Sequence, residues 1–82
     1  MKEIIIEYPM RNVSIAALKV GQILRRNNLN SIGYANAQYR TTYLFDDSAV
    51  LPEQSELEKM LKELNLRSIK VIELGLAHAS KT

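Results

Sequence analysis

A chain of 82 residues holds a single domain and is close to the smallest size at which one hydrophobic core is self-sufficient. It contains no cysteine and one histidine, which excludes disulfides and thiolate metal sites. The net charge of +2 is too small to imply a polyanionic partner by itself. Because no segment reaches the ~18–20 apolar residues of a membrane span and the N-terminus does not resemble a signal peptide, we expect a cytoplasmic protein without membrane contact.

Charge is unevenly distributed along the chain. Residues 1–40 hold six basic and two acidic side chains, whereas residues 41–66 hold six acidic and two basic ones. The sequence therefore predicts a basic side around the first helix and an acidic side around the second.

The first two elements are a strand and a helix. Residues 2–8 are an apolar run that ends at Pro9, which has no N–H for a strand ladder. Residues 13–27 predict a helix that Asn12 or Ser14 would cap. At helical spacing, six apolar side chains fall in one stripe roughly 120° wide, which we expect to face the core. They are Val13, Ala16, Ala17, Val20, Ile23 and Leu24.

The middle of the chain, residues 31–45, allows two interpretations. The spacing of its apolar and aromatic side chains also suits a helix, but the Arg-Thr-Thr-Tyr-Leu-Phe run at residues 40–45 favours a strand. We expect two short strands, residues 31–36 and 39–45, joined by a tight turn near Asn36. A helix over this segment remains the alternative.

The second half repeats the helix-then-strand order. Pro52 suits a first helical turn, and Ser55-Glu56-Leu57-Glu58 has the pattern of a capping box. The apolar residues that follow have the spacing of a core-facing helix: Leu57, Met60, Leu61 and Leu64. We expect the last strand at residues 68–75 and a frayed tail at residues 77–82.

The element order strand–helix–strand–strand–helix–strand predicts an α+β domain of the ferredoxin-like type over residues 1–76. In that split βαβ arrangement (βαββαβ), a four-stranded antiparallel sheet carries two helices on one face. A domain this small without disulfides or metal gains stability from regular packing or association, so we expect a homodimer.

Motifs for catalysis are weak throughout. The three glycines are too far apart for a phosphate loop, and His78, the one imidazole, falls in the expected tail. The adjacent carboxylates Asp46 and Asp47, joined by Glu7, are the remaining candidates for a metal-dependent nuclease. We regard that enzyme as the least favoured alternative, and we expect a non-enzymatic protein without cofactor or metal.

The first helix offers a candidate contact patch. Ile15 and Leu18 lie about 100–220° away from the core-facing stripe, among basic and polar side chains. The predicted protein-binding residues are Ile15, Leu18, Lys19, Gln22, Arg25 and Arg26. On the sheet, Ile5 and Leu44 would lie on the face that the helices leave open, where a second copy can bind. The principal hypothesis is a small binding or regulatory protein that acts through protein–protein contact.

Nucleic-acid binding is the second hypothesis. RNA-recognition motifs share the predicted topology and stack bases on sheet aromatics beside basic side chains. The residues available for this are Arg25, Arg26, Tyr39, Arg40 and Tyr43. The third strand of that family begins with a basic residue followed by glycine, whereas this chain has Arg40 followed by Thr41.

The layout also resembles that of ACT-type regulatory domains. Leu29-Asn30-Ser31-Ile32, after the first helix, is similar to the segment that those domains place there. The resemblance is one of layout and implies the same ferredoxin-like topology. The loop Pro9-Met10-Arg11-Asn12 lacks the glycine that the family commonly places beside its amino-acid ligand.

Overall fold

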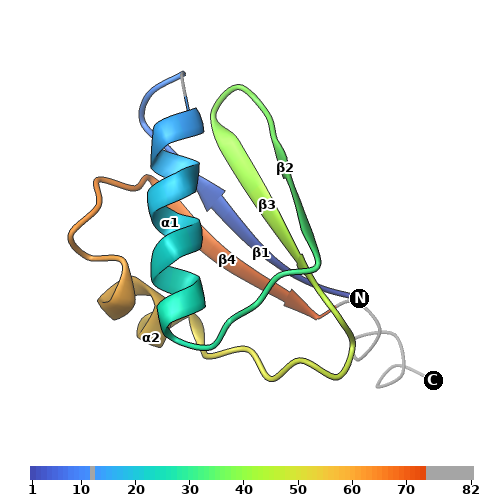
Figure 1. Ribbon diagram of the computed structural model, residues 1–82. Coiled ribbons are helices and arrows are strands. Elements are labelled where there is room, and N and C mark those ends of the chain that lie inside the picture. Colours follow the sequence, from blue (N-terminus) through green and yellow to red (C-terminus); the bar gives the residue numbers. More distant parts are fainter. Residues whose placement is uncertain (12, 74–82) are drawn as a thin grey trace.

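The computed structural model describes residues 1–11 and 13–73 (Figure 1). In chain order the elements are β1 (Lys2–Glu7), α1 (Ser14–Arg26), β2 (Gly33–Asn36), β3 (Arg40–Phe45), α2 (Gln54–Met60) and β4 (Ser68–Glu73). The strands form one antiparallel sheet in the order β2-β3-β1-β4. The predicted α+β class and four-stranded antiparallel sheet are therefore confirmed. The expected tail with His78 lies outside the described residues.

Alternation along the strands determines which face of the sheet is buried. Ile4 of β1 is paired with Tyr43 of β3 and with Val71 of β4, so all three point to the same side. Ile4 and Ile6 are fully buried, whereas Ile5 between them is only half-buried. One face of the sheet is thus the core face.

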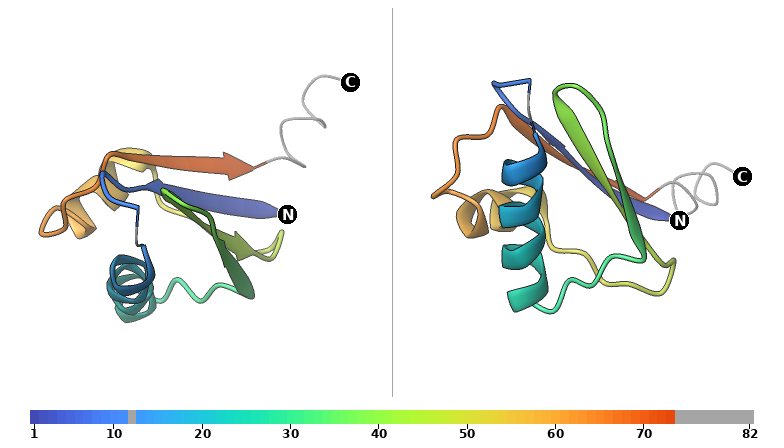
Figure 2. Two further views of the ribbon diagram at one scale, coloured as in Figure 1. Left: turned by 90° about the horizontal axis from the view of Figure 1, so that it is seen from above. Right: turned by 45° about the horizontal axis from the view of Figure 1, so that its top comes forward.

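Both helices pack their apolar sides into a single core with this face. The buried residues of α1 are Ala17, Val20 and Leu24, and Val13 just before it is buried too. These belong to the predicted stripe, whose other members Ala16 and Ile23 are partly buried. Leu57 of α2 and Leu61 after it complete the core, and α2 lies beside β4 (Figure 2).

The helix starts differ from those predicted. Val13 occupies the N-cap position of α1 without a side-chain hydrogen bond, so Ser14 is not the cap, and Asn12 is outside the described residues. In α2 the capping box is formed by Glu53 and Glu56. The Glu56 carboxylate accepts the backbone N–H of Glu53 at 3.3 Å. The predicted box from Ser55 was wrong because Ser55 already lies inside the helix.

The second helix is also shorter than its apolar spacing suggested. It ends at Met60, after which Leu64 N–H donates to the Leu61 carbonyl at 2.9 Å in a tight turn. Leu61 is buried and Leu64 partly buried, so the apolar residues still pack on the core. Turns can place such side chains correctly without a continuous helix.

Residues 31–45 contain a hairpin, and the helical alternative is wrong. The turn follows Asn36 and spans Ala37 to Arg40, where Ala37 N–H donates to the Arg40 carbonyl at 2.7 Å. Tyr8 N–H donates to the Tyr39 carbonyl at 2.8 Å, which ties this turn to the end of β1.

No helix among the described residues has the length and apolar character to cross a membrane.

Candidate functional site

An open groove separates α1 from the edge strand β2. Its volume is about 550 Å³. One wall is the side of α1 that faces β2, and the other comes from β2 and from the segment before it. The lining includes Leu18, Gly21, Gln22 and Arg25 of α1, and Tyr34, Asn36 and Tyr43 of the sheet.

The α1 wall combines apolar, amide and guanidinium groups. Leu18, Gln22 and Arg25 are all exposed and follow one another at helical spacing, so they form one stripe. Gly21 lies between them, opposite the ring of Tyr43. A Cβ at Gly21 would lie 3.9 Å from Tyr43 Cε1, an ordinary van der Waals contact. The glycine therefore widens the groove without being required by the packing.

Two tyrosines form the floor and the outer rim. The ring centroids of Tyr34 and Tyr43 are 6.2 Å apart with planes inclined by 33°. Tyr43 is 3% exposed and its hydroxyl donates to the Ala17 carbonyl at 2.7 Å, which joins β3 to α1. Tyr34 is 64% exposed. The site thus offers one fixed ring and one accessible ring.

A chain of polar groups runs from the core to the groove. The Tyr8 hydroxyl donates to Thr41 Oγ1 at 2.9 Å, and Thr41 Oγ1 donates to Asn36 Oδ1 at 2.7 Å. This turns the NH₂ group of Asn36 away from Thr41 and leaves it for donation at the rim. Burial raises the pKa of both Tyr8 and Tyr43 above the ordinary value, so the two hydroxyls stay protonated donors.

The predicted protein-binding residues divide between two adjacent stripes of α1. Leu18, Gln22 and Arg25 line the groove, whereas Ile15, Lys19 and Arg26 are exposed on the neighbouring outward stripe. Ile15 is 68% and Leu18 64% exposed. The two stripes together form a continuous surface, which we call the α1 surface.

Sequence reasoning missed the β2 side of the groove. Tyr34 is 64% exposed and lies directly opposite Tyr43 in the hairpin. The sequence signal for this wall was the placement of Tyr34 and Asn36 two residues apart, which puts them on one face of a strand. Which face that is becomes clear only when the hairpin register is known.

The residues proposed for nucleic-acid contact are not brought together. Tyr43 is buried beneath α1, while Tyr39 lies in the hairpin turn. Arg40, the first residue of β3, lies opposite Glu7 in the strand register, on the face away from the helices. Of that set, Arg25 and the buried Tyr43 line the groove.

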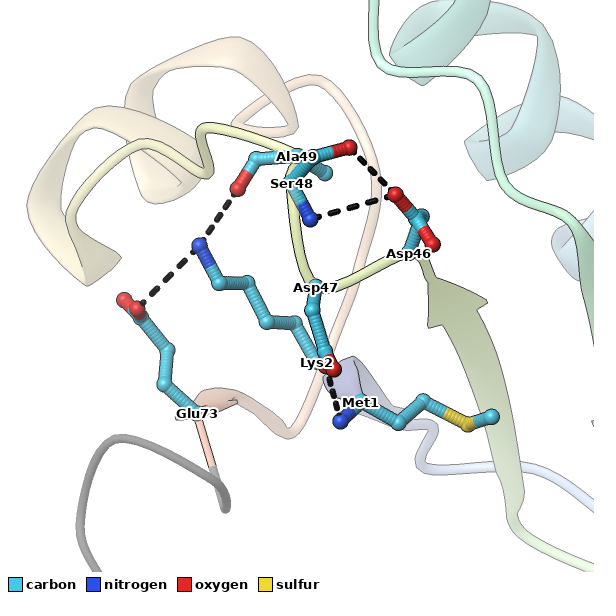
Figure 3. Close-up of polar contacts among 7 residues, drawn as sticks. All are labelled: Met1, Lys2, Asp46, Asp47, Ser48, Ala49 and Glu73. Atoms are coloured by element: carbon cyan, nitrogen blue, oxygen red, sulfur yellow. Dashed lines mark hydrogen bonds and ion pairs between the residues drawn. The ribbon is translucent and has the colours of Figure 1, made fainter. Parts of the chain in front are cut away.

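The candidate carboxylates are also separated. Asp46 and Asp47 follow the β3 end that pairs with Lys2, whereas Glu7 is at the other end of β1. Figure 3 shows Asp47 paired with the N-terminal amine and Asp46 hydrogen-bonded to the Ser48 hydroxyl. That hydroxyl lowers the pKa of Asp46. No group of three or more possible metal ligands exists among the described residues.

The acidic turn is part of the framework around Lys2. Lys2 Nζ donates to the Ala49 carbonyl at 2.5 Å and lies 3.6 Å from Glu73 Oε1 (Figure 3). At the opposite end of β1, the Ser68 hydroxyl donates to Glu7 Oε1 at 2.6 Å and lowers the pKa of that carboxyl. These charged groups connect strand ends and loop ends of the described part of the chain.

The face of the sheet away from the helices carries a second apolar set. Ile5, Leu44 and Ile72 come from three adjacent strands and alternate with the buried residues of the core face. All three are half-buried. As predicted for Ile5 and Leu44, these residues lie on the open face.

No protein-family model, curated protein or solved structure matches this chain.

Proposed function

We propose that this chain is a small non-enzymatic binding protein that contacts other proteins through the α1 surface and the adjoining groove. The observation that carries the proposal is the exposure of Ile15 and Leu18 beside a groove whose far rim exposes Tyr34. Large apolar side chains next to a concavity and rimmed by arginine have the composition of protein interfaces.

The fold we infer is ferredoxin-like. The order β-α-β-β-α-β and the central position of β1 between β3 and β4 support it. Such a fold does not specify a function, so the assignment depends on the site itself.

The charge of the α1 surface specifies the chemistry of the partner. The sequence of α1 contains Lys19, Arg25 and Arg26 and no acidic residue. A partner that places apolar side chains against Leu18 and carboxylates near these cations would match the surface in both shape and charge.

Self-association is a separate proposal and uses the open face of the sheet. Ile5, Leu44 and Ile72 would be covered by the same residues of a second copy. The face also carries Glu7 and Lys70, so charges of both signs are available for pairing across a twofold axis. Mass measurement in solution tests this: Ile5→Thr with Leu44→Thr should convert a dimer to a monomer, and a wild-type monomer would contradict it.

The binding proposal is tested by capture of proteins from the native host's extract on immobilised full-length chain. Ile15→Asp and Leu18→Asp should each abolish retention, since a carboxylate would replace an apolar contact. Val50→Asp is the matched control, because Val50 is 88% exposed in the loop before α2, outside the groove. Equal retention by all three variants, with folding verified by circular dichroism, would reject the α1 surface.

The same preparation decides between protein and nucleic acid. Binding to RNA or DNA that weakens steeply with salt and is lost in Arg25→Ala/Arg26→Ala would favour the second hypothesis. Retention of protein after nuclease treatment is the result expected here.

A further inference from the structure

We propose that the partner inserts an extended acidic segment into the groove, where it pairs with β2 as a fifth strand of the sheet. This rests on the proposed protein-binding function and specifies how the binding occurs. Strand addition of this kind derives affinity from backbone hydrogen bonds and selectivity from alternate side chains.

The backbone of β2 has groups directed to its open edge. Ala37 N–H donates to the Arg40 carbonyl, and hydrogen-bonded residues alternate in an antiparallel pair. Counting back in twos, Ala35 and Gly33 are the residues that bond to β3. The N–H and C=O groups of Tyr34 and Asn36 therefore point away from β3, toward the position that an added strand would occupy.

The groove adjoins this edge on the side of the sheet that faces α1, where Tyr34 and Asn36 line it. A strand pairs at about 4.8 Å from its neighbour and projects alternate side chains to the two faces of the sheet. Every second side chain of an added segment would then point to the side on which α1 lies, toward Leu18, Gln22 and Arg25. Tyr34 and Asn36, on the same face, would flank those side chains.

The two edges of the sheet differ in their protection against such pairing. Natural edge strands are commonly blocked by charged residues, proline or a covering element. β4 contains Lys70 and Glu73, and α2 packs next to it. β2 has the sequence Gly-Tyr-Ala-Asn, with neither charge nor proline. Among the described residues, the edge next to the groove is therefore the less protected one.

Charge selects an acidic segment over a second copy of β2. Pairing of β2 with itself across a twofold axis would bring two α1 helices toward the same new edge. Each helix carries Lys19, Arg25 and Arg26, and neither α1 nor β2 supplies an acid to neutralise them. A segment with Asp or Glu at alternate positions pairs with these cations instead.

The probe for this proposal is a random twelve-residue peptide library selected on the full-length chain. The enriched peptides should have alternating apolar residues with Asp or Glu. Arg25→Glu should weaken the best peptide by about tenfold or more, as loss of an interfacial charge pair does. Lys62→Glu, an exposed cation after α2, is the matched control and should leave binding unchanged.

N-methylation of single peptide amides tests the hydrogen bonding directly. Only every second amide of an added strand bonds to β2. Methylation of those amides should reduce affinity by about tenfold or more, and methylation of the amides between them should have little effect. Equal sensitivity of both sets of amides, or helical bound peptides, would overturn strand addition, and so would a selection without enrichment. If such peptides still lose binding in Leu18→Asp, the proposed function stands and only the mode is wrong. If Leu18→Asp has no effect on them, both fail.

Discussion

The two edges of the sheet are built in opposite ways. At the β4 edge, which we call the closed edge, α2 packs next to the strand, and Leu57 of α2 and Ile69 of β4 are buried in the shared core. The β2 edge has one neighbouring strand and exposed residues from Tyr34 to Asn36, and a groove lies between it and α1. We therefore expect substitutions on the β4 side to cost more stability, and we propose the β2 side as the binding surface.

This division explains why the groove persists in so small a protein. The Tyr43 hydroxyl joins α1 to β3 through its hydrogen bond to the Ala17 carbonyl. The side-chain hydrogen bonds from Tyr8 to Thr41 and from Thr41 to Asn36 join β1 to the hairpin. These hydrogen bonds fix the position of α1 relative to the sheet without direct packing of α1 against β2.

Truncation of the closed edge should be far more costly than truncation of the open one. Leu57→Ala should lower the free energy of unfolding by about 2–5 kcal/mol, the usual range for a buried leucine. Tyr34→Ala should lower it by less than about 1 kcal/mol, because the side chain is mostly exposed. Urea unfolding at fixed pH measures both. Similar losses for the two variants would remove the distinction between the edges.

The hydroxyl that joins β3 to α1 should have an intermediate effect. Tyr43→Phe removes its hydrogen bond to the Ala17 carbonyl and should lower the free energy of unfolding by about 1 kcal/mol. The same loss should also weaken partner binding, since the groove floor is less fixed. A stable variant with unchanged binding would mean that this hydrogen bond does not position the groove.

Alkaline pH should expose the same framework. The pKa of Tyr8 and of Tyr43 is raised in the folded state by burial, so only the unfolded chain loses these protons above about pH 10. Stability is therefore full below that pH and falls as the pH rises further. The tyrosinate absorbance of these two residues should appear together with loss of the circular dichroism signal. Comparison with Tyr8→Phe and Tyr43→Phe identifies the part of the absorbance change that comes from these two residues. Their ionisation at a pH below that of unfolding would contradict a raised pKa in the folded state.

Narrowing the groove should separate stability from binding. Gly21→Ala should stabilise the protein by about 0.5–1 kcal/mol through helix propensity, since the new methyl only reaches contact distance of Tyr43. Gly21→Leu should fill the groove and reduce binding more than Gly21→Ala does. Thermal unfolding and peptide affinity test this pair, and equal affinity for all three forms would argue against occupation of the groove.

Acid should have the smallest effect. The Ser68 hydroxyl holds the pKa of Glu7 below its ordinary value, so this contact contributes stability above the unfolded pKa of about 4.3. The contribution is lost as the pH falls through the folded pKa. Unfolding of wild type and Ser68→Ala across this range should show a smaller acid-dependent loss in the variant. An equal loss in the two proteins would show that the Ser68 hydroxyl is not what lowers the pKa of Glu7.

The sequence was sufficient for most of the architecture, because the apolar periods are strong. The stripe from Val13 to Leu24 and the bracketing strands could be predicted from spacing alone. The α2 cap and the end of that helix could not, since Glu53 and Ser55 both suit a helix start and Leu61 packs equally well from a turn. Local pattern does not distinguish these cases.

The candidate site was predicted only in half. Leu18, Gln22 and Arg25 were apparent as polar-face residues of a helix, whereas Tyr34 and Asn36 acquire a role only through pairing with β3. Their position depends on where the hairpin turns, and Ala37 to Tyr39 lack a strong turn signal. A shift of one residue would have placed both on the opposite face.

Amide hydrogen exchange along the whole chain, with and without a selected peptide, tests the central claim most directly. In the free protein the amides of Tyr34 and Asn36 should exchange much faster than that of Ala35, which bonds to β3. Saturating peptide should slow Tyr34 and Asn36 and leave β4 unchanged. Protection gained at β4 or α2, with Tyr34 and Asn36 unaffected, would contradict the assignment of the β2 edge and its groove as the binding surface.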